Sequence, residues 1–175
     1  YTWSTVNEKE GQFFAQDDAR FALRGVDDGY LSSRPESRRS FYWEATADEA
    51  VIDFDFETRE TLTLDEILSI REYYRGGAEL IDVPVLQVVG DDDFIGCGTN
   101  IQETVTVDCS DPEAVAAHER SRFAEDACLE TRVMPAAGHV LNLQTNAPDA
   151  YAVMLDWLDR RIGSDMGTPG SSPCE

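Results

Sequence analysis

The sequence predicts an α/β fold, in which parallel strands are flanked by helices, and two strand–turn–helix units predict it. The first begins with the apolar run 83–89, which Gly90 ends. A short and almost continuous apolar run is typical of a strand buried on both faces of a parallel sheet. The second unit has a strand at 128–134, a small-residue turn at 136–139 and a helix from Pro148.

The helices of these two units have recognisable beginnings. Asp111 and Pro112 supply an N-cap and a proline at the first helical position, which predicts a helix from there to about Ala124. Pro148 begins the last helix, and apolar residues follow it at helical spacing. These residues, which share one predicted helix face, are Tyr151, Met154, Leu155, Leu158 and Ile162.

The first part of the chain has weaker patterns. Residues 1–40 lack a steady period and predict loops and short helices, whereas 48–56 predicts a short helix. Thr63 and Glu66 have the spacing of a capping box, which predicts a helix from Thr63 to the glycines at 76–77. We expect three parts: a mostly helical cap or lid with connecting helices over 1–80, an α/β segment over 81–162, and a flexible tail over 163–175.

The charge of the chain excludes several classes of partner. Its net charge is −21, so it repels the phosphates of nucleic acids and of anionic lipids. No apolar run approaches the roughly 18 residues that a membrane-spanning helix needs. We therefore expect no nucleic-acid partner and no membrane span; the charge itself favours solubility or, less often, a cationic partner.

Four cysteines are present, Cys97, Cys109, Cys128 and Cys174, and only two histidines, so no zinc pattern can be formed. An even number of cysteines favours disulfides and an extracellular location, with free buried thiols and a cytoplasmic location as the alternative. The pairing stays open, but we expect one disulfide within the first three cysteines. Cys174 would then pair with the remaining one or with a segment outside this chain.

Residues able to do acid–base chemistry follow both predicted strands. Asp91, Asp92 and Asp93 come directly after Gly90, and His139 comes after Gly138. Because working side chains of α/β sheets lie beyond the carboxyl ends of the strands, these two turns should meet. A carboxylate that holds the Nδ1–H of a histidine leaves the other ring nitrogen to take a proton from a nucleophile. Structural roles are the alternatives: a solvated turn for the aspartates and a satisfied histidine.

The segments VPVLQVVGDDDF (83–94) and VMPAAGHVLNLQTNAPDAYAVMLDWL (133–158) resemble the last two strands of the α/β-hydrolase superfamily. In that family the triad acid commonly lies three residues after the glycine that ends its strand, which implies Asp93. The catalytic histidine follows a glycine after the last strand, which implies His139. Residues 25–67 are similar to the helical cap of a subgroup of these enzymes, so the resemblance covers most of residues 1–162.

The resemblance implies hydrolysis of an ester, or less often an amide, of a small molecule through an acyl-enzyme, without a cofactor. The nucleophile motif G-x-S-x-G is absent, and Ser164 and Ser171 follow His139, against the family's order of Ser, acid and His. We therefore expect the nucleophile on a separate N-terminal chain of the same hydrolase, made by proteolytic nicking; a simple fragment is the alternative. An acyltransferase, dehalogenase, epoxide hydrolase or non-catalytic binding subunit also remains open.

Two further clusters have open interpretations. One is aromatic and either lines a substrate pocket or forms core: Phe13, Phe14, Phe41, Tyr42 and Trp43. The other, Arg34, Arg38 and Arg39, either clamps an anionic substrate or offsets nearby acids, and the second interpretation is favoured. His118 lies among charged residues in a predicted helix and is expected to be a surface residue. Three adjacent aspartates without a calcium loop do not predict a metal site.

Overall fold

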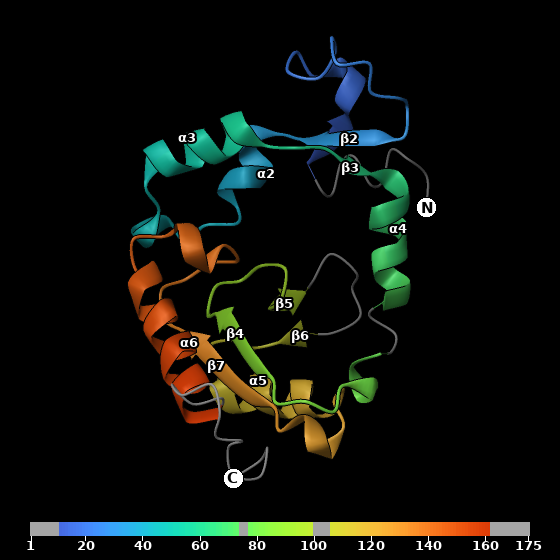
Figure 1. Cartoon of the computed structure of the whole chain (residues 1–175). Coiled ribbons are helices and arrows are strands. Elements are labelled where there is room, and N and C mark those ends of the chain that lie inside the picture. Colours follow the sequence, from blue (N-terminus) through green and yellow to red (C-terminus); the bar gives the residue numbers. More distant parts are fainter. Residues whose placement is uncertain (1–10, 74–76, 100–105, 162–175) are drawn as a thin grey trace. The chain divides into compact units, whose positions relative to one another are not determined.

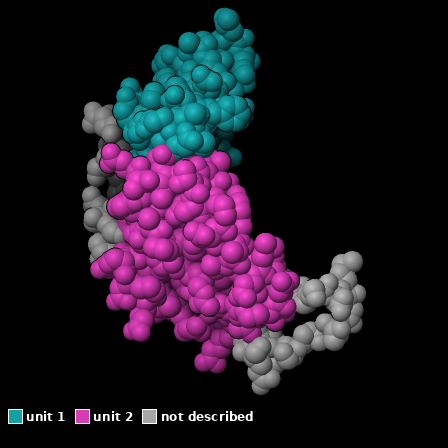
Figure 2. All heavy atoms as spheres, turned by 90° about the vertical axis from the view of Figure 1, so that its left-hand side faces the viewer, with its two compact units in different colours: residues 1–41, 48–75 teal, residues 42–47, 76–175 magenta. Residues whose placement is uncertain are grey.

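A computed structural model describes residues 11–73, 77–99 and 106–161 of the chain. These residues belong to two compact units, coloured separately in Figure 2. Unit 1 consists of Tyr1–Phe41 and Asp48–Arg75, and unit 2 of Tyr42–Ala47 and Gly76–Glu175. Helices and strands are mixed, and the chain contains a small parallel sheet, as an α/β class requires.

Unit 1 contains a three-stranded antiparallel sheet with the order β1–β2–β3 (Figure 1). Its strands are β1 (Gln12–Phe14), β2 (Tyr30–Ser33) and β3 (Leu62–Thr63). The prediction of loops and short helices for residues 1–40 is therefore wrong for two of these strands. Strands of three and four residues are too short to show an alternating pattern, and their pairing along the sheet forms them instead.

The helices of unit 1 are α2 (Pro35–Arg39), α3 (Glu49–Thr58) and α4 (Leu64–Tyr73). The predicted capping box is confirmed, because Glu66 N–H donates to Thr63 Oγ1 (3.1 Å) and Thr63 N–H donates to Glu66 Oε2 (2.6 Å). Asp48 caps α3 by accepting a hydrogen bond from Ala50 N–H at 2.9 Å. The glycine predicted to end α4 at position 76 lies outside the described residues.

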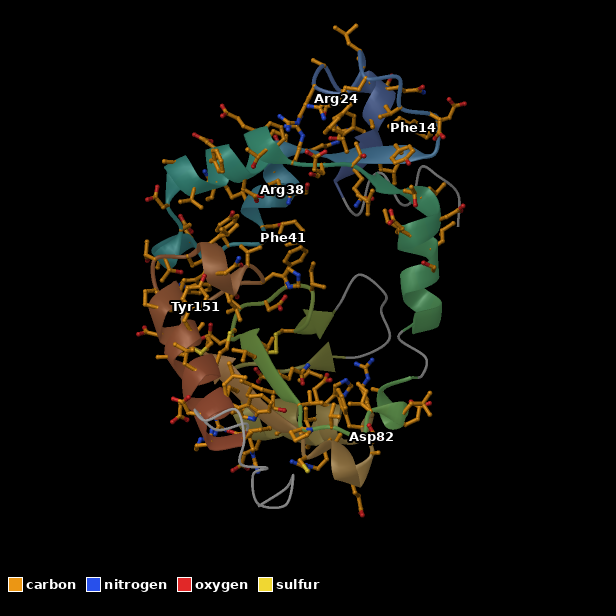
Figure 3. The ribbon with its side chains drawn as sticks, in the orientation of Figure 1. Phe14, Arg24, Arg38, Phe41, Asp82 and Tyr151 are labelled. Atoms are coloured by element: carbon orange, nitrogen blue, oxygen red, sulfur yellow. A yellow bond between two sulfur atoms is a disulfide. The ribbon has the colours of Figure 1, made fainter. Side chains whose placement is uncertain are left out.

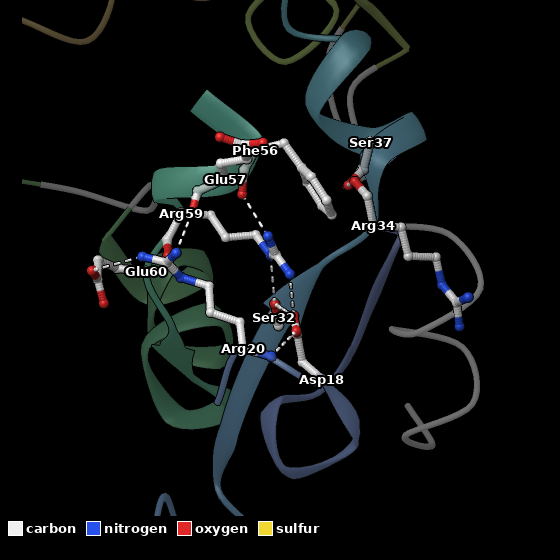
Figure 4. Close-up of polar contacts among 9 residues, drawn as sticks. All are labelled: Asp18, Arg20, Ser32, Arg34, Ser37, Phe56, Glu57, Arg59 and Glu60. Carbon is white, nitrogen blue, oxygen red and sulfur yellow. Dashed lines mark hydrogen bonds and ion pairs between the residues drawn. The ribbon is translucent and has the colours of Figure 1, made fainter. Parts of the chain in front are cut away.

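A buried polar network holds unit 1 together (Figure 4). The carboxylate of Asp18 accepts hydrogen bonds from Ser32 Oγ and from Arg59 Nη2, both at 2.6 Å. Arg59 Nε also donates to Ser32 Oγ at 3.2 Å, and its guanidinium lies 3.8 Å from the ring centroid of Phe56. Asp18, Ser32 and Arg59 are all less than 10% exposed, so each charge in this core has a partner of opposite sign or a hydrogen-bond donor.

Unit 2 is built around two parallel strands, β4 (Leu86–Gly90) and β7 (Glu130–Met134). Their register pairs Leu86 with Glu130 at one end and Gly90 with Met134 at the other. The parallel pairing confirms the predicted α/β arrangement of this segment. Burial is less complete than the apolar run predicted, because in this chain the β4 side chains before Gly90 are only half-buried.

A helix packs on each face of this sheet: α5 (Pro112–Arg120) and α6 (Ala147–Arg161). Successive strand residues point to opposite faces. Accordingly Val89 packs with Val115 of α5, in one apolar cluster, while Val88 packs with Ala150 of α6, in another. The predicted cap of α5 is confirmed, since Asp111 Oδ1 accepts a hydrogen bond from Glu113 N–H at 3.0 Å.

The face of α6 that contacts the rest of unit 2 differs from the predicted apolar stripe. Tyr151, Leu155 and Leu158 are 45%, 61% and 41% exposed, whereas Ala150 and Trp157 are buried. Tyr151 projects from α6 (Figure 3), and its hydroxyl donates to the carbonyl of Asn142 at 3.3 Å. Ala150 and Trp157 therefore face the interior, together with Met154, which packs against the cluster of Ala150, while Tyr151, Leu155 and Leu158 are exposed.

The predicted loop 96–110 contains a short antiparallel pair, β5 (Gly98–Thr99) and β6 (Thr106–Val107), which the sequence did not predict. A disulfide joins Cys97 to Cys109, which confirms a pair within the first three cysteines. Cys128 is also disulfide-bonded. Cys174 and the predicted tail over 163–175 lie outside the described residues.

Further turns of 3-10 helix complete the described chain. They are Ala15–Asp17, Glu44–Thr46, Ala78–Leu80, Glu125–Ala127 and Leu141–Leu143. Among the described helices, none is both long enough and apolar enough to cross a bilayer.

Candidate active site at the carboxyl ends of β4 and β7

Two turns leave the sheet of unit 2 at the same edge, because β4 and β7 end on paired residues. The N–H of Asp91 donates to the carbonyl of Met134 (3.0 Å), and the N–H of Asp92 donates to that of Ala137 (3.0 Å). Only glycine fits at position 90, since a Cβ there would lie 2.1 Å from the carbonyl oxygen of Ala137. The sheet thus places the turn after β4 directly against the turn after β7.

Asp93 and His139, the two residues predicted to form the site, are brought together by these turns. Nδ1 of His139 lies 2.9 Å from Oδ2 and 3.0 Å from Oδ1 of Asp93. Asp93 is 6% exposed, whereas the His139 side chain is 41% exposed. A buried carboxylate therefore holds an imidazole that reaches the surface of unit 2.

The charge state of Asp93 fixes the tautomer of His139. Burial by itself raises the pKa of Asp93, but hydrogen bonds from His139 and from the backbone N–H groups of Gly96 and Ile95 outweigh it, so the pKa lies below its usual value. An ionised carboxylate can only accept hydrogen bonds, so Nδ1 of the ring carries the proton. The second nitrogen, Nε2, is then the basic one in the neutral ring.

The other two aspartates of the turn have different roles. Asp91 accepts hydrogen bonds from the backbone N–H groups of Ala136 (3.0 Å) and Ala137 (3.1 Å), so it joins the two turns. Ala136 has φ +53°, a left-handed conformation that is costly for an L-residue and that these contacts help to hold. Asp92 is exposed overall. The small loss of solvent around its carboxyl group, together with the charges of Asp91 and Asp93, raises its pKa.

Gln144 is a residue of the site that the sequence did not predict. It is 4% exposed, and its Oε1 accepts hydrogen bonds from the N–H groups of Gly138 (3.1 Å) and Trp43 (2.8 Å). Thr46 belongs to the same contact region, because its carbonyl accepts a hydrogen bond from Thr145 N–H at 2.9 Å. No local pattern could predict these contacts, since the segment around Trp43 is about a hundred residues away.

An open hollow of about 480 Å³ adjoins the acid turn. It is lined by four carboxylates, the disulfide and two apolar side chains: Asp91, Asp92, Asp93, Asp108, Cys97, Cys109, Phe94 and Val107. A lining with this charge repels anions and favours neutral or cationic molecules.

The aromatic cluster is divided between the two units, and the basic cluster contacts side chains of unit 1. Phe13, Phe14 and Phe41 belong to unit 1, and Tyr42 and Trp43 belong to unit 2. Arg38, labelled in Figure 3, and Arg39 contact acids of unit 1, as the favoured interpretation predicts, whereas Arg34 contacts a ring. Arg34 lies over the ring of Phe13 at 5.3 Å, Arg38 lies 3.5 Å from Asp55, and Arg39 donates to Glu49 at 2.8 Å.

Neither the metal-ligating side chains nor the comparisons with known proteins give a further indication of chemistry. Within 11–73, 77–99 and 106–161, no three histidine, cysteine, aspartate or glutamate side chains are grouped as metal ligands. His118 lies on α5, with Nε2 at 3.6 Å from Glu119, and is remote in sequence from both turns. No protein-family model matches the chain, and a comparison with curated proteins gave no match.

Proposed function

We propose that this chain carries the acid and the general base of an α/β-hydrolase that cleaves esters, or less readily amides, through an acyl-enzyme. The observation that carries the proposal is the contact between Asp93 and His139 Nδ1 at 2.9 Å, at the edge where two parallel strands end. The His139 side chain is 41% exposed, so another molecule can reach the ring.

The chemistry follows from the tautomer. As a serine hydroxyl attacks the carbonyl carbon of the substrate, Nε2 of His139 takes its proton, and the ring becomes an imidazolium. Asp93 stabilises that cation through Nδ1–H, and its low pKa keeps it ionised while it does so. The imidazolium then protonates the leaving alcohol, and the same nitrogen activates the water that releases the acid.

The nucleophile is proposed to lie on a separate N-terminal chain of the same hydrolase, because no G-x-S-x-G occurs in this sequence. The oxyanion-hole donors would come from the same chain. The disulfides favour an oxidising compartment, and we propose an extracellular location.

The proposal is tested on the protein isolated from its natural source. Intact-mass measurement should find a second polypeptide bound to this chain, and a fluorophosphonate probe should label a serine on it. Substituting His139→Ala in this chain should abolish both the labelling and the hydrolysis of a p-nitrophenyl ester.

The matched control is His118→Ala, the only other histidine in the chain, which should leave labelling and hydrolysis unchanged. Full hydrolytic activity in His139→Ala would remove His139 from the mechanism. A partner chain without any nucleophile near His139 would favour the alternative of a non-catalytic binding subunit.

A further inference from the structure

The turn that carries His139 is held on both sides of the histidine by one side chain. Oε1 of Gln144 accepts the N–H of Gly138 at 3.1 Å, and Nε2 of Gln144 donates to the carbonyl of Val140 at 3.4 Å. Gly138 and Val140 are the two neighbours of His139 in the chain. The amide of Gln144 therefore fixes the backbone directly before and directly after the proposed base.

The orientation of this amide is determined by its partners. Oε1 faces two backbone N–H groups, those of Gly138 and Trp43, which can only donate. Turning the amide over would bring its NH₂ group against both donors and would leave them without acceptors. Because Gln144 is 4% exposed, water could not replace the lost bonds easily.

The amide also connects the turn to a segment far away in the sequence. Trp43 N–H donates to Oε1 at 2.8 Å, and Thr46 Oγ1 lies 2.9 Å from the carbonyl of Ala136 and 3.1 Å from Oε1. The segment Tyr42–Ala47 is part of unit 2 and holds the turn through these contacts. Asp91 holds the earlier half of the turn, and Gln144 holds the half that contains the histidine.

We infer that Gln144 is a positioning residue that keeps the His139 ring in hydrogen-bond contact with Asp93; its kinetic consequence rests on the proposed function. Without Oε1, the buried N–H of Gly138 loses its acceptor and the turn gains freedom around His139. The ring would then spend less time with Nδ1–H directed at Asp93. Because Gln144 is 4% exposed, we expect it to act on the ring of His139 rather than on the substrate, so kcat should fall while KM stays unchanged.

The first measurement concerns the His139–Asp93 contact and needs no activity. In the proton NMR spectrum of the full chain, His139 Nδ1–H should give a downfield resonance, assigned by its absence from His139→Ala. In Gln144→Met, which has a similar volume and no hydrogen bonds, this resonance should weaken or disappear. The matched control is Gln87→Met on β4, because Oε1 of Gln87 has no hydrogen-bond partner among the described residues; that variant should retain the resonance.

Two further variants decide the matter if Gln144→Met does not fold. Gln144→Glu keeps an acceptor for the N–H of Gly138 but loses the donor to the carbonyl of Val140, so it should retain more of the resonance than a variant without the acceptor. Gln144→Asn is one methylene shorter and should lose it. Equal spectra for these two variants, or the reverse order, would overturn the inference.

The second measurement uses the natural complex with its partner chain. There kcat for Gln144→Met should fall by about 10- to 100-fold, with KM within about twofold of wild type, because a small displacement of a catalytic group costs this much. An unchanged resonance and unchanged kcat in an active complex would overturn the role of Gln144 and leave the proposed function intact. A complex without hydrolytic activity in which the resonance still responds to Gln144→Met would overturn the proposed function, while the positioning of the pair would stand.

Discussion

Among the residues that the structure describes, unit 1 and unit 2 each bury one aspartate, but the two aspartates have different partners. Asp18 in unit 1 is 5% exposed and contacts Arg59, which is 8% exposed; Asp93 in unit 2 is 6% exposed and contacts a His139 side chain that is 41% exposed. In both cases burial raises the pKa, and hydrogen bonds more than compensate, so both carboxyl groups have lowered pKa values. Both carboxyl groups are thus ionised at neutral pH.

The difference lies in what the partner can do. A guanidinium keeps its charge at every physiological pH, so the pair in unit 1 can only stabilise the fold. An imidazole can gain or lose a proton near neutral pH, and exposure lets it exchange that proton with another molecule. A buried carboxylate is therefore informative about function only when its partner is known.

The largest contrast is expected from removing each charge without changing the shape of the side chain. Asp93→Asn should lower kcat of the complex by about 10⁴-fold, because a neutral amide neither stabilises an imidazolium nor enforces the tautomer. Asp18→Asn should leave kcat unchanged in the fraction of protein that is folded. Steady-state hydrolysis of a p-nitrophenyl ester measures both, with Asp149→Asn as a control in unit 2. Equal losses from the two variants would mean that Asp93 acts through stability alone.

The reverse contrast concerns stability. Asp18→Ala leaves the charge of Arg59 buried without its partner, which should cost unit 1 about 3–5 kcal/mol of unfolding free energy. Hydrogen exchange at the amide of Leu31, a fully buried residue of β2, reports this loss. Asp17→Ala removes the adjacent, exposed carboxylate and should change protection little. If both variants exchanged at the same rate, the buried pair would not stabilise unit 1.

The response to reducing agents separates the units because unit 1 contains no cysteine. Replacing Cys97 and Cys109 by serine opens a loop with a sequence separation of 12, which should cost unit 2 about 3 kcal/mol. Dithiothreitol should lower the urea midpoint of wild-type unit 2 at least as much, because it also reduces the disulfide of Cys128, and should not affect unit 1. A midpoint that stayed the same in the double variant would show that the loop is held by other contacts.

The smallest expected effect concerns Asp92, whose contribution to stability changes with pH in the direction opposite to that of Asp18 and Asp93. Because the pKa of Asp92 is raised, its contribution to stability is complete below the ordinary pKa of an aspartate and is lost as the pH rises through the raised value. Asp92→Asn should therefore stabilise unit 2 at pH 7 by at most about 0.5 kcal/mol, since the side chain is exposed. The gain should vanish under acid conditions. For Asp18 and Asp93, with lowered pKa values, stability is lost as the pH falls through those values. A gain at low pH in urea titrations of Asp92→Asn would contradict this sign.

Much of unit 2 could be predicted because its signals are local. Three local features predicted a parallel strand pair with Asp93 and His139 at one edge. They are the apolar run before Gly90, the cap at Asp111 and the order of the two strand–turn–helix segments. The strands of residues 12–14 and 30–33 could not be predicted, because they depend on pairing with each other and with β3. Gln144 was missed for the same reason. Its partner Trp43 is distant in sequence, and a glutamine in a turn carries no pattern of its own.

The paired ends of β4 and β7 also have an evolutionary consequence. Asp93 is three residues beyond Gly90, and His139 is five beyond Met134. The contact between them therefore depends on the number of residues that separate each side chain from the common sheet edge. Related chains could exchange most side chains of the two turns and keep the contact. An insertion or deletion in either turn would displace one partner by about 3.3 Å for each residue in extended chain. An alignment of relatives should therefore be free of gaps over residues 86–93 and 130–139, while length varies between 98 and 107.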